Sequence, residues 1–130
     1  MDVNKYVGLP YAENGRGPAY DCYGLVRLVY ADRLGVVLPS YDGCYHGHTD
    51  PMLPELILCE SKRWIKTDHP EPLDVIRIRI NGKPLHVGLF MRPGWMLHQL
   101  HGCESCTEQY TNPLWSKRID GFYRYHPDHR

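Results

Sequence analysis

Three residues of this chain have the types and the order that acyl transfer requires: Cys22, His86 and His98. A cysteine thiolate is a strong nucleophile, and an imidazole within hydrogen-bonding reach can take the proton of the thiol. A second imidazole can hold the first in the tautomer that faces the nucleophile. We therefore expect Cys22 to be a catalytic nucleophile, His86 its base and His98 the residue that orients the base.

Cys22 stands at the start of the clearest helical pattern in the chain. Asp21 is a favourable N-cap residue and Gly35 is a favourable stop, so a helix is expected between them. Apolar residues recur there with the helical period at Cys22, Leu25, Val26 and Val29. The unpaired N–H groups and the dipole of a helix N-terminus favour a thiolate and can bind an oxyanion. Because Cys22 also lies on the apolar stripe, an inert packed cysteine is the competing interpretation.

The two histidines lie on consecutive predicted strands, and the turn between them decides whether they meet. A two-residue turn would place His101 opposite His86 and turn His98 to the other face of the sheet. A three-residue turn would place His98 opposite Gly88 and diagonally beside His86. We predict the three-residue turn, because Gly94 can take the positive φ that its last position requires. His101 remains the alternative partner.

The surrounding residues predict an α+β fold. An irregular segment is expected over 39–54 and a short helix over 53–62. Apolar and polar residues then alternate, and Asn81-Gly82 is a strong tight-turn pair. The expected strands cover residues 75–80, 85–91, 95–100 and 119–125. Because helices come first and antiparallel strands follow, the pattern is that of the α+β class.

Composition limits the class of protein. The chain has 130 residues, 42% of them hydrophobic, which suits one domain over residues 1–130 with a packed core. Fifteen basic and fifteen acidic residues cancel, so no basic surface is expected to bind nucleic acid. No apolar run approaches the roughly 20 residues that span a bilayer, and residues 1–5 lack the pattern of a secretory signal. We therefore expect synthesis in the cytoplasm and no membrane span.

The cysteines leave a metal site open as an alternative. Their number, five, is odd, which argues against a full disulfide framework. Cys103 and Cys106 have the spacing of a two-ligand pair. Further ligands could come from His98, His101, Cys44, His46 and His48. A single Cys-x-x-Cys pair is weak evidence, so we expect no bound metal and no cofactor.

Two motifs resemble those of the NlpC-type cell-wall cysteine peptidases. They are Asp21-Cys22-Tyr23-Gly24-Leu25-Val26 and His86-Val87-Gly88-Leu89-Phe90, with Tyr11 before the first and His98 after the second. The resemblance extends over residues 6–125. It implies a papain-like α+β fold in which the nucleophile helix packs on an antiparallel sheet. It also implies hydrolysis of amide bonds in peptidoglycan stem peptides, often between D-glutamate and a diamino acid.

The same resemblance implies roles for single residues. Cys22 would be the nucleophile, His86 the base and His98 the third polar residue. Tyr11 matches a tyrosine that lines the pocket near the nucleophile. Substrate contacts are expected from Tyr11, Asp21, Tyr23 and Gly88. Tyr23 stands where many members carry serine, so the shape of the subsites is expected to differ.

A longer stretch resembles one branch of that family. Residues 21–39 and 114–124 are similar to the branch found in tail-tip assembly proteins of long-tailed bacteriophages. This implies a location in the virion tail after synthesis in the host cytoplasm. The implied partners are a peptidoglycan stem peptide and other tail-tip or baseplate hub proteins. The alternative is a structural tail component whose peptidase site is inactive or occluded.

Overall fold

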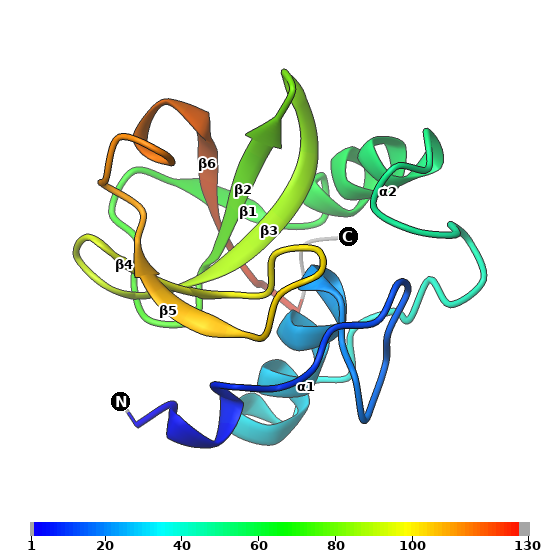
Figure 1. Ribbon diagram of the computed structural model, residues 1–130. Coiled ribbons are helices and arrows are strands. Elements are labelled where there is room, and N and C mark those ends of the chain that lie inside the picture. The colour runs from blue at the N-terminus through cyan, green and yellow to red at the C-terminus, as the bar shows by residue number, and fades with distance from the viewer. Residues whose placement is uncertain (1, 128–130) are drawn as a thin grey trace.

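Six antiparallel strands form one sheet in the computed structural model, which describes residues 2–127. The order of the strands is β1-β6-β2-β3-β4-β5, so the last strand of the chain returns to lie between β1 and β2 (Figure 1). The strands are β1 Ile65–Thr67, β2 Val75–Ile80, β3 Lys83–Arg92, β4 Trp95–His98, β5 Cys106–Gln109 and β6 Ile119–Arg124.

Two α-helices, α1 Cys22–Leu34 and α2 Met52–Ser61, both contact β3 (Figure 1). Val26 and Val29 of α1 share the larger hydrophobic cluster with Val87 and Leu89 of β3. The remaining helical segments are the 3-10 helices η1 Asn4–Tyr6 and η2 Ser116–Arg118. The α+β class and the packing of the helix that begins at Cys22 on an antiparallel sheet are therefore confirmed. Within residues 2–127, neither helix has the length and apolar character needed to cross a membrane.

The opposite face of the sheet has a second hydrophobic cluster. It contains Ile76, Ile78, Phe90, Met96 and Trp115. Side chains of a strand point alternately to the two faces, so the even-numbered residues of β3 belong to this side. His86 and Gly88 therefore face the second cluster, whereas Val87 between them faces α1.

The ends of α1 explain the sequence motif around Cys22. The Asp21 carboxylate accepts a hydrogen bond from the Gly24 backbone N–H at 2.7 Å, which caps the helix. A Cβ atom on Gly24 would lie only 2.0 Å from the carbonyl oxygen of Gly15, so only glycine permits this close approach. At the other end, Gly35 ends the helix in the left-handed conformation. The spacing Asp-Cys-x-Gly thus fixes both the cap and the loop that lies against it.

The register between β3 and β4 confirms one prediction and corrects another. Gly88 pairs with His98, as predicted. The turn, however, has two residues, because Arg92 pairs with Trp95. Met91 is an extra residue on β3, and this β-bulge shifts the pairing by one position. The predicted three-residue turn is therefore wrong, although the predicted pairing is right.

Other predicted elements agree in part. Helix α2 and strands β2, β3 and β6 lie where they were expected. The third strand ends at His98 instead of continuing to residue 100. Strands β1 and β5 were not predicted, because both are short and mostly polar or exposed.

We predict that Gly24→Ala destabilises the protein by about 1–3 kcal/mol, because the new methyl group must displace the backbone at Gly15. The intrinsic helix propensity acts in the opposite direction, since alanine stabilises a helix by about 1 kcal/mol relative to glycine. The measurement is the free energy of unfolding in denaturant. Ala31→Gly, on the exposed side of α1, measures propensity alone. A Gly24→Ala variant more stable than the wild type would contradict the close packing.

Candidate active site

A cleft of about 400 Å³ opens beside the N-terminus of α1 and holds both Cys22 and His86. We call it the Cys22 cleft. Its walls also include Tyr11, Asp21, His48, Gln99 and His101.

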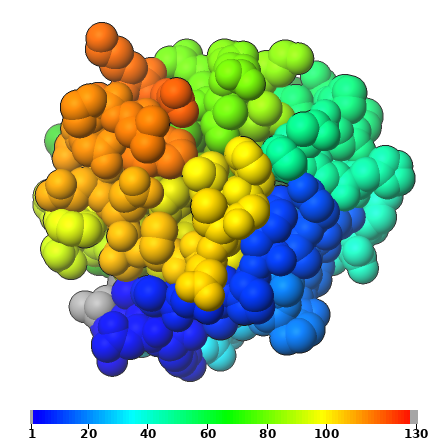
Figure 2. All heavy atoms as spheres, in the orientation of Figure 1, coloured from blue at the N-terminus to red at the C-terminus, as the bar shows by residue number. Residues whose placement is uncertain are grey.

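The N-terminal segment and the segment after β4 lie against each other, because Ser105 donates its backbone N–H to Leu9 O at 3.0 Å. Figure 2 shows this contact on the surface, with the residues near position 100 in yellow against the N-terminal residues in blue.

Cys22 is the first residue of α1 and is 8% exposed. Burial, together with the negative charge of Asp21, raises the pKa of its thiol to about 12. The backbone N–H groups of Val87 and Tyr23 act in the opposite direction without overcoming that effect. The expectation of a resting thiolate is therefore wrong, because desolvation outweighs the potential of the helix N-terminus. At rest Cys22 is a thiol.

His86 and His98 are joined by a hydrogen bond between His86 Nε2 and His98 Nδ1, which lie 2.9 Å apart. The other nitrogen of His98, Nε2, lies 2.8 Å from Glu108 Oε1 on β5. The side chains of His86 and His98 are 2% and 1% exposed. Burial lowers the pKa of both imidazoles below the usual 6.5, and for His86 the charges of His98 and His101 lower it further. Both rings are therefore neutral near pH 7.

The carboxylate of Glu108 determines which nitrogens carry the protons. A carboxylate only accepts hydrogen bonds, so His98 Nε2 must donate to it. His98 Nδ1 is then an acceptor, and His86 Nε2 donates to it. Because His86 Nε2 carries the proton, His86 Nδ1 has a free electron pair and can take a proton from a thiol. We call the series Glu108–His98–His86 the histidine relay.

Gly88 makes room for His98 in the histidine relay, a role that was not predicted. A Cβ atom at Gly88 would lie 3.2 Å from His98 Cβ, closer than ordinary packing allows. The ring of Trp115 covers the other side, stacked on His86 at 5.9 Å and edge-on to His98 at 5.3 Å between ring centres. The missing side chain of Gly88 therefore leaves room for His98. Gly88 is not among the residues that line the Cys22 cleft, and its contact with a substrate stays a prediction.

Asp21 is 5% exposed, and its carboxylate already has three partners. It accepts hydrogen bonds from the Gly24 N–H, from the Tyr45 hydroxyl and from Arg16 Nη1, the last at 3.0 Å. Arg16 also donates to Ser40 O and Tyr45 Oη at 2.9 and 2.8 Å. Although Asp21 forms part of the cleft wall, this network occupies its carboxylate. The structure thus gives Asp21 the role of fixing the start of α1 next to Cys22.

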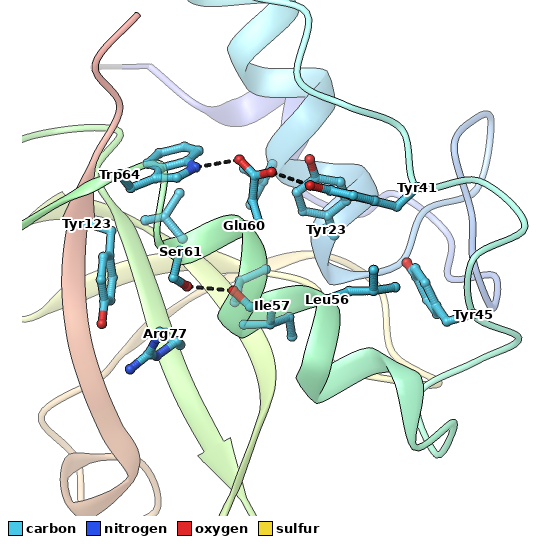
Figure 3. A pocket seen from close by; sticks show the side chains of 13 residues that line it. Tyr23, Tyr41, Tyr45, Leu56, Ile57, Glu60, Ser61, Trp64, Arg77 and Tyr123 are labelled. Carbon is cyan, nitrogen blue, oxygen red and sulfur yellow. Dashed lines mark hydrogen bonds between the residues drawn. The ribbon is translucent and has the colours of Figure 1, made fainter. Parts of the chain in front are cut away.

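Tyr23 is not among the residues that line the Cys22 cleft, so its contact with a substrate stays a prediction. It points into a separate aromatic pocket between α1, α2 and the sheet, and its hydroxyl donates to Pro39 O at 2.6 Å. Figure 3 shows Tyr23 there beside Tyr41 and Glu60, whose Oε1 accepts from the Tyr41 hydroxyl at 2.5 Å. The aromatic pocket encloses only about 50 Å³, which is too little for a peptide. Tyr23 and Cys22 are neighbours in the chain but line different pockets, because successive residues of the first helical turn point in different directions.

Tyr11 does line the Cys22 cleft, where it joins a group of polar side chains at the rim. Its hydroxyl donates to Glu13 Oε2 at 2.9 Å, and Glu13 Oε1 lies 2.5 Å from His48 Nδ1. The ring of His48 stacks on His101 with 4.1 Å between the ring centres. His101, the alternative partner of His86, is therefore an exposed residue of the rim and not a member of the histidine relay.

Sequence reasoning missed three residues of this site. Glu108 and Trp115 complete the surroundings of the histidines, and Gln99 forms a buried part of the cleft wall. The amide nitrogen of Gln99 donates to Leu9 O at 2.7 Å, whereas its Oε1 is buried with no hydrogen-bond partner among residues 2–127. The sequence does contain a signal for Glu108, because it lies two residues after Cys106 and therefore on the same face of a strand. That signal could be used only if β5 had been predicted as a strand.

The model of the NlpC/P60 family matches residues 8–124, so the chain belongs to this family. Among curated proteins, a gamma-DL-glutamyl hydrolase of Bacillus subtilis (strain 168) is 42% identical over 41 residues. That match covers 30% of this chain and 10% of the relative, so the two share only a short stretch.

Solved structures share the fold. NlpC1 from Trichomonas vaginalis has a TM-score of 0.69 at 19% identity, with 95% of this chain and 41% of that one covered. An NlpC/P60 family protein from Bacillus cereus has a TM-score of 0.68 at 22% identity, covering 95% and 38%. The peptidoglycan hydrolase RipB from Mycobacterium tuberculosis has a TM-score of 0.60 at 20% identity, covering 93% and 59%. This chain therefore spans less than two thirds of each of these proteins.

We predict that at pH 7 both His86 and His98 are neutral and carry their proton on Nε2. The reason is that Glu108 accepts from His98 and that burial disfavours both imidazolium forms. Long-range proton–nitrogen NMR spectra of the histidine side chains distinguish the tautomers. At pH 6.5, where a free imidazole is half protonated, both rings should be less protonated than that, and His86 should remain neutral. An Nδ1–H tautomer of His86 in the wild type would contradict the histidine relay.

Proposed function

We propose that this chain is a cysteine endopeptidase that hydrolyses amide bonds in peptidoglycan stem peptides. The single observation that carries the proposal is the histidine relay next to a cleft that also contains Cys22. Membership of the NlpC/P60 family supports it. The names of two similar proteins, a peptidoglycan hydrolase and a gamma-DL-glutamyl hydrolase, agree with the substrate class.

The proposed reaction begins with a neutral thiol and a neutral imidazole. His86 Nδ1 takes the proton of Cys22 as the sulfur attacks the carbonyl carbon, because the raised pKa of the thiol disfavours a thiolate beforehand. The backbone N–H of Cys22 at the start of α1 holds the oxyanion. The C–N bond then breaks, the proton passes from His86 to the leaving amine, and a thioester remains on Cys22. Water, deprotonated by His86, hydrolyses the thioester and restores the thiol.

Two cleft residues suit an amide substrate. The Gln99 Oε1 atom is a buried acceptor, and an N–H group of a bound peptide would satisfy it. Tyr11 lies in the same cleft and presents a hydroxyl beside Glu13. The scissile bond that we propose is the one between D-glutamate and a diamino acid, in line with the name of the Bacillus subtilis relative.

The proposal includes a setting in the tail tip of a bacteriophage. Its support is the resemblance of residues 21–39 and 114–124 to tail-tip assembly proteins. In this setting the partners are other tail-tip or baseplate hub proteins, and the enzyme reaches the wall as part of the virion tail. The alternative is a structural tail protein whose Cys22 cleft neighbouring chains cover. Mass spectrometry of purified virions tests the setting, and absence of the chain from particles of its own phage would contradict it.

We predict that Cys22→Ala lowers the rate of hydrolysis of peptidoglycan fragments at least about 1,000-fold, because Cys22 is the cysteine that lines the cleft and the thioester forms on its sulfur. New amino groups released from purified muropeptides measure the rate. Cys59→Ala, which removes an exposed thiol on α2, is the matched control and should keep full activity. Thermal unfolding should show that both variants are folded. Unchanged cleavage by folded Cys22→Ala would refute the proposed function.

Activity should persist at pH 6.5 and fall only at lower pH, as His86 becomes protonated. The sign follows from the lowered pKa of His86, since the base is competent above that pKa and lost below it. The dependence of kcat/KM on pH measures this effect. An acid limb above pH 6.5 would contradict a buried, neutral base.

We predict that Glu108→Gln lowers kcat about 10-fold and moves the acid limb to lower pH. The carboxylate raises the pKa of His98, and the proton that ends activity at low pH is shared between His98 and His86 along their hydrogen bond. Glu104→Gln removes the same charge from an exposed loop position and should change neither quantity. A loss of activity with no shift of the acid limb would indicate that Glu108 has only a structural role.

A further inference from the structure

Two residues of the histidine relay, His98 and Glu108, also belong to a group of side chains that could hold a metal ion. His98 on β4 pairs directly with Cys106 on β5, and Glu108 lies two residues further along the same face of β5. One ring nitrogen of His98, Cys106 Sγ and a Glu108 carboxylate oxygen all lie within 4.8 Å of one another. The nitrogen of His98 that faces Glu108 is Nε2, 2.8 Å from Oε1. Nitrogen, sulfur and carboxylate oxygen are the donors that zinc prefers.

We propose that His98, Cys106 and Glu108 form a binding site for Zn²⁺, and that Zn²⁺ bound there inhibits the peptidase. The inhibitory part rests on the proposed function, whereas binding of the metal does not. Cys103 is exposed and lies outside this group of donors, so the site differs from the Cys-x-x-Cys pair considered in the sequence. Glu108 takes the place that Cys103 has in that alternative.

The spacing of the three donors suits one tetrahedral ion. Ligand atoms at the usual zinc distances of roughly 2.0–2.3 Å lie roughly 3.5 Å from one another. The His98–Glu108 pair, at 2.8 Å, is slightly closer than this and would open as the ion enters. The backbone pairing of β4 and β5 holds all three residues in register, so only side-chain rotations are needed.

Access is available from the edge of the sheet. Strand β5 is an outer strand, and Cys106 and Glu108 are each partly exposed, while His98 is buried. An ion would therefore bind first to the two outer donors and then to His98 Nε2. The fourth position remains open for water, as in zinc sites with three protein ligands.

Zinc at His98 Nε2 would reverse the histidine relay. The ion takes the electron pair of Nε2, so the proton of neutral His98 must lie on Nδ1, the atom bonded to His86. His86 Nε2 then accepts, and the proton of neutral His86 moves to Nδ1. In the proposed reaction His86 Nδ1 takes the proton of Cys22. Once Nδ1 carries a proton itself, His86 can no longer act as the base, although Cys22 is unchanged.

Binding is tested with Cys22→Ala protein, in which the nucleophile cannot bind metal. Titration with Co²⁺ should show one equivalent with a thiolate-to-cobalt charge-transfer band, and Zn²⁺ should displace it. Cys106→Ser should abolish the band, whereas Cys103→Ser, which removes the neighbouring thiol, should keep it. Absence of the band in Cys22→Ala, or its loss on Cys103→Ser and not on Cys106→Ser, would overturn the site.

Inhibition is tested with the active wild type and with Cys106→Ser, a residue outside the proposed catalytic group. The two should hydrolyse muropeptides equally without metal, and Cys106→Ser should need at least 10-fold more Zn²⁺ for half inhibition. NMR should show the proton of His98 moving from Nε2 to Nδ1 as Zn²⁺ binds to Cys22→Ala protein. Equal inhibition of both proteins would place the effect at Cys22 and overturn the inhibitory role. Protein that binds cobalt but never cleaves would instead refute the proposed function and leave the metal site standing.

Discussion

The extra residue at Met91 is the constraint on which the proposed chemistry depends. It shifts the pairing of β3 and β4 by one position, and in a sheet a shift of one residue turns every side chain to the opposite face. With the bulge, His98 lies beside His86. The next hairpin then brings Glu108 onto the same face. Without it, His101 would oppose His86, and His98 would point toward the helices.

Burial determines the electrostatics of the site. The cysteine and both histidines are almost fully enclosed, and burial raises the pKa of Cys22 and lowers the pKa of His86. Each group is therefore neutral at rest, and charge develops only as the sulfur attacks. The carboxylate of Asp21 at the start of α1 is paired with Arg16 and accepts three hydrogen bonds. The site thus contains two separate networks. The charged pair of Asp21 and Arg16 positions Cys22, and the neutral imidazoles of the histidine relay take up its proton.

The sequence predicts the parts of this site that depend on local chemistry. Asp21 and Gly35 mark the ends of α1, and the helical period places Cys22 at its first turn. The pairing of His98 with Gly88 was also predicted, yet through a turn that the structure lacks, because a bulge leaves no mark in residue spacing. Strand β5 was missed since Cys106–Gln109 is short and polar, and Glu108 was missed with it. The roles of Tyr23 and Gly88 depend on tertiary packing, which periodicity does not report.

The most direct test of the account is to trap the covalent intermediate. Wild-type protein is mixed with a γ-D-glutamyl-diamino acid peptide and quenched in acid during turnover, and its peptides are mapped by mass spectrometry. The account predicts an acyl group on the peptide that contains Cys22, and none when His86 is replaced by alanine. Turnover that leaves Cys22 unmodified while another residue carries the acyl group would contradict it.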